Sequence, residues 1–528
     1  MTHIKAIKSM GLPKYRCVRF CKKSDLEVLS LGKFVYRVLS VLIGLCVLTL
    51  CACAPKPLTA EAETTTVKKM VYEAERAQMS GGVKMRTNIK GYSGEGYATA
   101  FEKDDSKCLF TVEIPQDGFY DLNFISASGP NEYKENYVDV DGERIGIVSV
   151  NSATFTDSVC ERVYMAKGTH TVAFIKYWGW THLDRLQITL SNPISSDAYN
   201  IAPALVNKSA DDNAKRLMKY LTDIYGTKFL SGQYCDTGAN GKENFAIRTV
   251  TGKRPAVLGL DLMEATPSRV LNGSKDAAVD YAIEFDKMGG IVTFCWHWNA
   301  PEDYITDIWW RAFYTDATNI DLKRIMDGDD SKGYDLIIRD IDAIAEELKK
   351  LENAGVPVLW RPLHEASGGW FWWGAKGPEA YIQLWNLVYD RLTNVHGLNN
   401  LIWVWNGQDK AWYPGDATVD IIGEDIYPGE KVYASQMGRY LQALDYTDAN
   451  KMIVLSENGV LFDPDLAIRD GAMWGFFATW GGEFVLKSDK LSVYSEQFTE
   501  TAMLKKVYAH ESVLTLEDLP DLKNYPVD

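Results

Sequence analysis

The segment Pro357-Val-Leu-Trp-Arg-Pro-Leu-His-Glu365 begins as a short apolar run and ends in a cluster of polar side chains. Stretches with helical periodicity flank it at residues 334–352 and 378–392. A buried strand that alternates with helices is the repeating unit of a parallel α/β fold. The segment therefore predicts one strand of such a fold, with the polar cluster at the carboxyl end of that strand.

Similar apolar runs recur along the chain, and helical stretches separate them. The expected strands are residues 228–231, 256–260, 290–294, 357–360, 401–404, 419–422, 452–455 and 473–477. About eight strand–helix repeats over roughly 300 residues are typical of a (β/α)8 TIM barrel, an α/β fold. A doubly wound open sheet is the alternative, but no GxGxxG motif follows the first run. We assign the barrel domain to residues 205–515.

Residues 70–190 carry a different pattern, in which short strands and turns follow one another without a helical stretch. Two hairpins are expected here: residues 137–140 with 144–150, and residues 161–165 with 170–175 around Lys167-Gly168. This spacing predicts an N-terminal all-β sandwich of roughly 120 residues. Residues 191–204, between the sandwich and the barrel, are expected to be a linker.

The N-terminal segment predicts export. Scattered positive charges precede residues 38–50, which are apolar and uncharged. This run is too short to span a membrane comfortably but suits the core of a signal peptide, which we assign to residues 1–52. Leu50-Cys51-Ala52-Cys53 resembles a bacterial lipobox, and this resemblance implies lipidation of Cys53 and a membrane-anchored lipoprotein at the cell surface or in the periplasm. Residues 53–69 look like a flexible tether.

Composition narrows the classes of partner. The net charge of −15 argues against nucleic acid. The 16 Trp and 28 Tyr residues fit either a carbohydrate binder, whose aromatic faces stack on sugar rings, or a Trp-rich core. In an exported protein Cys108 and Cys160 could form a disulfide, and the sequence leaves this pairing open. We expect a monomer.

Two glutamates occupy the positions that barrel enzymes use for catalysis. Glu365 follows the fourth expected strand and Glu457 the seventh, and catalytic groups of TIM barrels lie at the carboxyl ends of strands. Cleavage of a glycosidic bond requires one carboxyl group as acid and a second as nucleophile or base. A metalloenzyme would need more histidine than the seven present, of which His297 and His364 are the two near strand ends. A serine hydrolase lacks its GxSxG motif.

Residues 205–510 resemble glycoside hydrolase family 26. The resemblance is carried by Leu230-Ser-Gly-Gln233 and by the block from Arg361 through His364-Glu365 to Trp373-Gly374. It implies that Glu365 is the acid/base and Glu457 the nucleophile, with no cofactor for catalysis. The implied substrate contacts are His297, Arg361, His364, Trp370, Trp373, Asp425, Tyr427 and Trp480.

The implied activity is that of a retaining endo-β-1,4-mannanase acting on mannan or galactomannan. The motifs around the two glutamates leave open a β-glucanase (lichenase) or a β-1,3-xylanase of the same family. A non-catalytic surface glycan-binding lipoprotein is a further alternative, which the intact pair Glu365 and Glu457 disfavours.

Residues 70–190 resemble carbohydrate-binding modules of families 35 and 6. The opening Tyr72-Glu-Ala-Glu-Arg-Ala-Gln78 and the closing Tyr177-Trp-Gly-Trp180 carry this resemblance. It implies a β-glycan ligand that stacks on Trp178 or Trp180. It also implies a structural calcium ion held by Glu73, Glu75 and Asp184, since carboxylate oxygens suit this hard cation.

Overall fold

The computed structural model describes residues 69–129, 132–488 and 490–527. The signal peptide expected at 1–52, Cys53 and all but the last residue of the tether expected at 53–69 lie outside these residues. Within the described part of the chain, no helix has both the length and the apolar character needed to cross a membrane.

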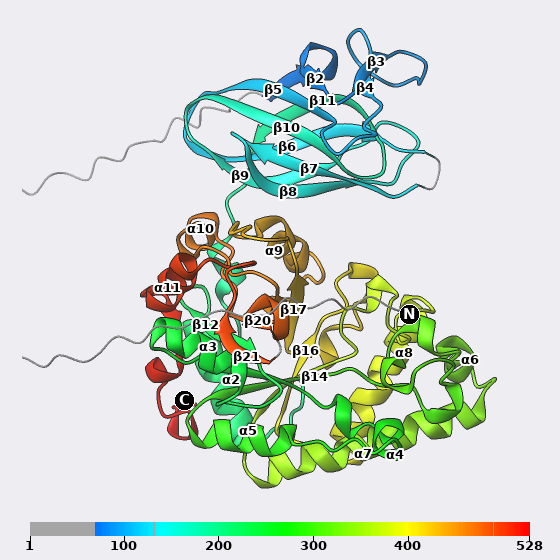
Figure 1. The fold of residues 1–528 in the computed structure, drawn as a ribbon, viewed down its shortest axis with the longest axis vertical. Coiled ribbons are helices and arrows are strands. Elements are labelled where there is room, and N and C mark those ends of the chain that lie inside the picture. The colour runs from blue at the N-terminus through cyan, green and yellow to red at the C-terminus, as the bar shows by residue number, and fades with distance from the viewer. Residues whose placement is uncertain (1–68, 130–131, 489, 528) are drawn as a thin grey trace, which may run out of the picture. The chain divides into compact units, whose positions relative to one another are not determined.

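The C-terminal part is a closed barrel of parallel strands (Figure 1). Its strands are β12 (Phe229–Tyr234), β13 (Val257–Asp261), β14 (Ile291–Trp296), β15 (Val358–Pro362), β16 (Leu401–Trp405), β17 (Ile421–Ile426), β18 (Met452–Asn458) and β19 (Phe476–Thr479). Strand β12 pairs with both β13 and β19, which closes the sheet, and the short strand β22 (Val513–Leu514) pairs with the first two residues of β12. The predicted barrel and its strand order are confirmed.

Helices surround the barrel on its outer side. They are α2 (Asp212–Ile224), α3 (Lys242–Thr251), α4 (Pro267–Leu271), α5 (Ala278–Lys287), α6 (Leu322–Met326), α7 (Ser331–Asn353), α8 (Pro378–Asp390), α9 (Met437–Leu444), α10 (Pro464–Asp470) and α11 (Thr501–Ala509). Both helices predicted beside the opening segment form, as α7 and α8. Their starts are encoded locally: the Asp330 side chain accepts a hydrogen bond from Gly333 N, and Pro378 lies in the first turn of α8.

One connection departs from the expected repeat. Between β16 and β17 the fully described residues 406–420 form only two 3-10 turns, η9 (Lys410–Trp412) and η10 (Asp416–Thr418). Pro414 and Gly415 interrupt this short stretch, and Gly415 has a φ of 103°. Because proline lacks an N–H donor and this glycine is left-handed, the connection forms no α-helix.

Strand side chains alternate between two apolar clusters. On β15, Val358 and Trp360 pack with the helices, whereas Leu359 belongs to the cluster that contains Ile402 and Val404. Nine of the 16 tryptophans are almost fully buried, among them Trp360. The Trp-rich composition therefore reflects the core more than a sugar-binding surface.

Residues 70–190 form two packed antiparallel sheets, as predicted. One sheet contains β1 (Met70–Glu73), β3 (Lys84–Arg86), β4 (Tyr97–Thr99), β6 (Gly118–Ala127), β9 (Val159–Met165) and β11 (His182–Leu190). The other contains β2 (Gln78–Ser80), β5 (Lys107–Ile114), β7 (Lys134–Val140), β8 (Glu143–Val150) and β10 (Gly168–Trp178). Apolar side chains from both sheets, such as Leu122 and Phe174, form one buried cluster.

Two expectations about the sandwich are now decided. The hairpin of β7 and β8 is confirmed, but β9 and β10 do not pair: β9 pairs with β6, and β10 pairs with β5 and β7. The turn at Lys167-Gly168 therefore carries the chain from one sheet to the other. Cys108 on β5 and Cys160 on β9 are buried free thiols, and burial raises the pKa of each to about 12. The disulfide that the sequence left open is not formed.

Candidate active site

Three carboxyl groups converge at the carboxyl ends of the barrel strands. Glu365 follows β15 by three residues, Asp425 lies at the end of β17, and Glu457 lies at the end of β18. Carboxylate oxygens of all three lie within 4.8 Å of one another. The barrel thus brings together two glutamates that are 92 positions apart in the sequence (457 minus 365).

Glu457 is surrounded by hydrogen-bond donors. Arg361 donates from Nη2 to its Oε1 in a buried ion pair, and the Tyr427 hydroxyl donates to Oε2 at 2.6 Å. Both oxygens of Glu457 are therefore held in place by donors, and the Arg361 guanidinium is its buried counter-charge.

Arg361 connects this carboxylate to its neighbours. Its Nη1 donates to Asp425 Oδ2 at 2.8 Å and to Asn406 Oδ1 at 3.1 Å, and its Nη2 donates to the Tyr234 hydroxyl at 3.1 Å. Burial disfavours the guanidinium charge, but the Asp425 and Glu457 carboxylates outweigh this effect and raise the pKa of Arg361. Removing Arg361 would leave these carboxylates buried without a counter-charge.

Glu365 lies in a different electrostatic environment. Burial and the negative charge of Glu457 raise its pKa to about 7. The Trp370 indole donates to its Oε2 at 3.0 Å, and no ion pair reaches it among the described residues. A carboxyl group with this pKa is substantially protonated at neutral pH and can donate a proton.

The backbone at Glu365 is strained. Leu363 and Glu365 have φ values of 54° and 51°, in the left-handed region that residues with a side chain rarely adopt. The turn is held because Glu365 N donates to the Asn406 backbone oxygen at 2.7 Å and Trp373 Nε1 donates to His364 O at 2.8 Å. Asn406 therefore fixes the position of Glu365 from the neighbouring strand.

Two histidines lie beside the carboxyl groups. The Nε2 atoms of His297 and His364 are 3.1 Å apart, so one nitrogen donates to the other. His297 packs against the ring of Trp480, with ring centroids 5.8 Å apart. Trp370 and Tyr427 are 47% and 42% exposed, so they offer accessible rings next to the glutamates.

The barrel also matches a known family. Residues 206–517 match the model of glycosyl hydrolase family 26. The chain belongs to this family. It is therefore a glycoside hydrolase, and the carboxyl groups described above belong to a family 26 barrel. Residues 70–191 match the carbohydrate binding module of family 35, so of the two module families expected from the sequence it is family 35 that is matched.

Several relatives share both domains with this family 26 chain. A mannan endo-1,4-beta-mannosidase of Thermothelomyces thermophilus is 42% identical over 87% of this chain and 92% of the relative. Mannan endo-1,4-beta-mannosidase B of Piromyces sp is 34% identical over 87% of this chain and 78% of the relative. A Podospora anserina GH26-CBM35 beta-(1,4)-mannanase of known structure is 39% identical over 86% of this chain and 99% of that chain, with a TM-score of 0.60.

Two of the expected substrate contacts in the family 26 barrel are fully buried. Arg361 donates to Asp425 and Glu457, and Trp373 donates to the His364 backbone oxygen. Both side chains thus hold other residues of the site in place, and their contact with substrate stays a prediction.

Three residues around the site were not assigned from the sequence. They are Tyr234 and Asp261, which end strands β12 and β13, and Asn406, which follows β16. Each contacts the site, through Arg361, His297 and Glu365 respectively. All three have polar side chains at the carboxyl end of a barrel strand, as Glu365 and Glu457 do. This position is the sequence signal by which they can be recognised.

The family 35 module exposes the two expected tryptophans. Trp178 ends β10 and Trp180 lies two residues later, and they are 58% and 59% exposed. Tyr133 lies beside Trp178, with ring centroids 6.0 Å apart, and Lys134 Nζ lies 5.8 Å from the Trp178 ring. Both indoles are therefore accessible at one end of strands β10 and β11.

The expected calcium ligands meet around the loop of residues 93–95. Glu73 accepts from the Ser93 hydroxyl at 2.7 Å, Asp184 from Ser93 N at 2.8 Å, and Glu75 from Glu95 N at 2.7 Å. Glu75 Oε2 is buried and has no hydrogen-bond partner among the described residues. An orphaned carboxylate oxygen and three acidic groups suit a divalent cation. Glu73, Glu75 and Asp184 do not bring one oxygen each within 4.8 Å of one another. Among the described residues, the two groups of possible metal ligands that are this close both lie in the barrel.

Proposed function

We propose that the chain is a retaining endo-β-1,4-mannanase in which Glu365 is the acid/base and Glu457 the nucleophile. The observation that carries the proposal is the closeness of the two carboxyl groups, whose nearest oxygens lie within 4.8 Å. Retaining enzymes hold their carboxyl groups about 5–5.5 Å apart, whereas inverting enzymes need about 6.5–9.5 Å to admit a water molecule. The short separation supports a double displacement.

In the first step Glu457 attacks the anomeric carbon while Glu365 protonates the leaving oxygen. Arg361 and Tyr427 donate to the two oxygens of Glu457 and orient it for this attack. Once Glu457 is esterified, its negative charge is gone, and the pKa of Glu365 falls because that charge was one cause of its elevation. Glu365 then accepts a proton from the water that releases the sugar. The same carboxyl group can thus act first as an acid and then as a base.

The substrate assignment is supported by the relatives, which are named as mannan endo-1,4-beta-mannosidases over most of this chain. The test is product analysis on mannan, galactomannan, lichenan and β-1,3-xylan in parallel, with NMR of the first-formed anomer. We expect internal cleavage of the two mannans with retention of configuration. A first product of inverted configuration would reject the mechanism, and cleavage of lichenan or β-1,3-xylan alone would reject the substrate.

For the module we propose binding of a soluble β-glycan by stacking on Trp178 or Trp180. An indole face and a sugar ring bury apolar area without requiring charge. Affinity electrophoresis of the full chain, with Trp178→Ala and Trp180→Ala, tests this. Exposed Met85 on β3, in the sheet that does not contain β10, provides a control as Met85→Ala. If a mannan gel retards the wild-type protein and both tryptophan variants equally, the sugar-binding surface lies elsewhere.

We also propose a structural calcium ion at Glu73, Glu75 and Asp184. Asp184 already pairs with Arg185, and the ion would add a second positive charge at this carboxyl group, whose pKa is raised by burial and by the charge of Glu73. A cation bound by the folded state alone stabilises that state. Calorimetry should show the sandwich transition at a higher temperature with calcium than with a chelator. An unchanged transition would reject the site.

Finally, we propose that the protein is exported and anchored by a lipid on Cys53, and that it acts as a monomer. The anchor rests on the sequence at residues 50–53 alone. Cys53→Ser should abolish labelling by a radioactive fatty acid in the producing cell. A wild-type protein that is not labelled would reject the lipobox interpretation.

A further inference from the structure

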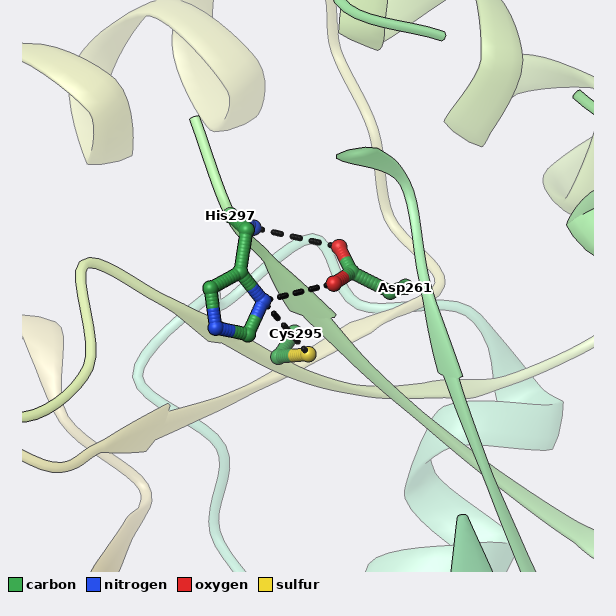
Figure 2. A group of neighbouring side chains, drawn as sticks. All are labelled: Asp261, Cys295 and His297. Carbon is green, nitrogen blue, oxygen red and sulfur yellow. Dashed lines mark hydrogen bonds and ion pairs between the residues drawn. The ribbon is translucent and has the colours of Figure 1, made fainter. Parts of the chain in front are cut away.

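A cluster of three side chains, Asp261, Cys295 and His297, lies at the carboxyl ends of β13 and β14 (Figure 2). Asp261 Oδ2 lies 2.6 Å from His297 Nδ1, and Asp261 Oδ1 accepts the His297 backbone N–H at 3.1 Å. Oδ1 also accepts the Met263 N–H at 2.9 Å. Cys295 Sγ is more distant from His297 Nδ1, at 3.9 Å. Asp261 is thus pinned by two backbone donors and faces one nitrogen of His297.

The other nitrogen of His297 faces His364. Their Nε2 atoms are 3.1 Å apart, and His364 directly precedes Glu365 on the strained turn after β15. Asp261, His297 and His364 therefore form a continuous hydrogen-bonded chain that ends one residue from the acid/base. Nδ1 of His364 is buried and has no hydrogen-bond partner among the described residues.

We propose that Asp261 is a positioning residue of the reaction, which holds His297 as an imidazolium and thereby fixes the proton of His364 on Nδ1. An imidazolium has two N–H donors. His297 then donates from Nδ1 to Asp261 and from Nε2 to the lone pair of His364 Nε2. His364 remains neutral, and its own proton must lie on Nδ1. The effect of Asp261 on catalysis rests on the proposed glycosidase function.

The surrounding charges support this distribution. Burial disfavours a charge on His297, but the carboxylate of Asp261 outweighs burial and raises the pKa of His297. Burial and the positive charge of His297 lower the pKa of His364 well below its usual range. The titratable and charged groups that face His297 are Asp236, Asp261, Cys295, Arg361, His364, Glu365 and Glu457.

A cationic His297 also acts on the two glutamates. Its positive charge lowers the pKa of Glu365, and the charge of Glu457 in turn favours the imidazolium. Loss of the Asp261 charge would therefore change the protonation of His297, the tautomer of His364 and the field at both glutamates. Because the pKa of His297 is raised, its charge is present below that pKa and is lost as the pH rises through it.

The test compares wild type with Asp261→Asn, which preserves shape and removes the charge. Asp141→Asn is the matched control, because Asp141 Oδ2 lies 2.6 Å from His170 Nδ1 and raises the pKa of that histidine in the sandwich domain. The first readout is the ¹⁵N NMR spectrum of the histidine-labelled full chain, with His297 assigned through His297→Gln. The second is the pH profile of kcat/KM on an aryl β-mannobioside with a good leaving group, whose glycosylation step needs no proton from Glu365.

We expect wild-type His297 to show two protonated nitrogens at pH 7 and His364 to be neutral with its proton on Nδ1. Asp261→Asn should make His297 neutral at pH 7. It should also lower kcat/KM by about tenfold or more and move the basic limb of the kcat/KM profile to lower pH by about one unit. The Asp141→Asn profile should match wild type.

A neutral His297 in the wild-type spectrum would overturn the proposal, and this readout does not require the variant to fold. An unchanged basic limb in a folded Asp261→Asn protein would also overturn it, since a purely structural role would lower kcat/KM without moving the profile. If wild type fails to cleave mannans, the proposed function fails, while the histidine spectra still decide the protonation chain.

Discussion

At the residue scale, Glu365 and Glu457 carry the same side chain in two environments. Glu457 accepts from Arg361 and Tyr427, whereas Glu365, among the residues that the structure describes, accepts only from the Trp370 indole and faces the charge of Glu457. Donors orient the Glu457 carboxylate, whereas burial beside a negative charge raises the pKa of Glu365. The sequence could identify the two residues, but their surroundings depend on Arg361, which is brought to Glu457 only by the barrel.

Replacement of Glu365 by alanine should separate the two kinds of substrate. We expect a loss of about 10²–10⁴-fold in kcat/KM on mannan, because the leaving sugar needs a proton, and a far smaller loss on an aryl glycoside with a good leaving group. Steady-state kinetics on both substrates are the measurement. Glu379→Ala, at an exposed position on α8, should resemble wild type on both. Equal losses on the two substrates would contradict the acid/base role.

Removal of the Tyr427 hydroxyl should slow the reaction by loosening Glu457. Tyr427→Phe deletes a donor that lies 2.6 Å from Glu457 Oε2, so the carboxylate is less firmly oriented for attack. We expect kcat on mannan to fall by about tenfold or more, and steady-state kinetics are the measurement. Tyr525→Phe is a control, because its hydroxyl donates to the Asp223 carboxylate at 2.9 Å outside the site. An unchanged kcat in Tyr427→Phe would show that the hydroxyl does not position Glu457.

At the element scale, the turn after β15 determines where Glu365 lies. Gly374 packs against this turn so closely that an added Cβ would lie 2.0 Å from the Ala366 backbone oxygen. Gly374→Ala should therefore shift the turn and lower kcat on mannan by about tenfold or more, since misplacement by about 1 Å costs catalysis heavily.

The measurement is kcat on mannan beside the melting temperature of each protein. Gly438→Ala on α9 is the control, because no atom lies within 4 Å of its added Cβ and its φ is not positive. We expect wild-type activity from Gly438→Ala. Full activity in Gly374→Ala would show that the turn can move without affecting Glu365.

The elements differ in how far the sequence predicts them. The barrel strands and helices α7 and α8 were predictable, because their periodicity and end signals are local. The false hairpin at Lys167-Gly168 arose because a turn signal is local, whereas the partners of β9 and β10 lie elsewhere in the chain. The burial of Arg361 and Trp373 was equally hidden, since it depends on neighbouring strands rather than on spacing.

At the scale of the whole molecule, the chain joins a catalytic barrel to a module with exposed tryptophans. The net charge of −15 produces no attraction to a neutral polysaccharide, so contact area and tethering must supply the affinity. Glu365 and Glu457 lie in the barrel, whereas Trp178 and Trp180 lie in the module. Catalysis and capture of the polymer can therefore be altered separately.

A chain that begins at residue 191 should separate these two functions. On short manno-oligosaccharides we expect kcat/KM within about twofold of the full chain, because Glu365, Glu457 and their contacts all lie beyond residue 205. On dilute or insoluble mannan we expect a loss of about tenfold or more, because binding by the module raises the local concentration of substrate around the barrel.

The full-length Trp178→Ala/Trp180→Ala double variant should reproduce this loss, since it keeps the fold of the module and removes its exposed rings. Initial rates on both substrates, at several polymer concentrations, are the measurement. The difference between the proteins should disappear at saturating polymer, where tethering no longer limits encounter. A truncated chain that loses activity equally on short oligosaccharides would instead indicate that the module stabilises the barrel, and a parallel fall in melting temperature would identify that cause.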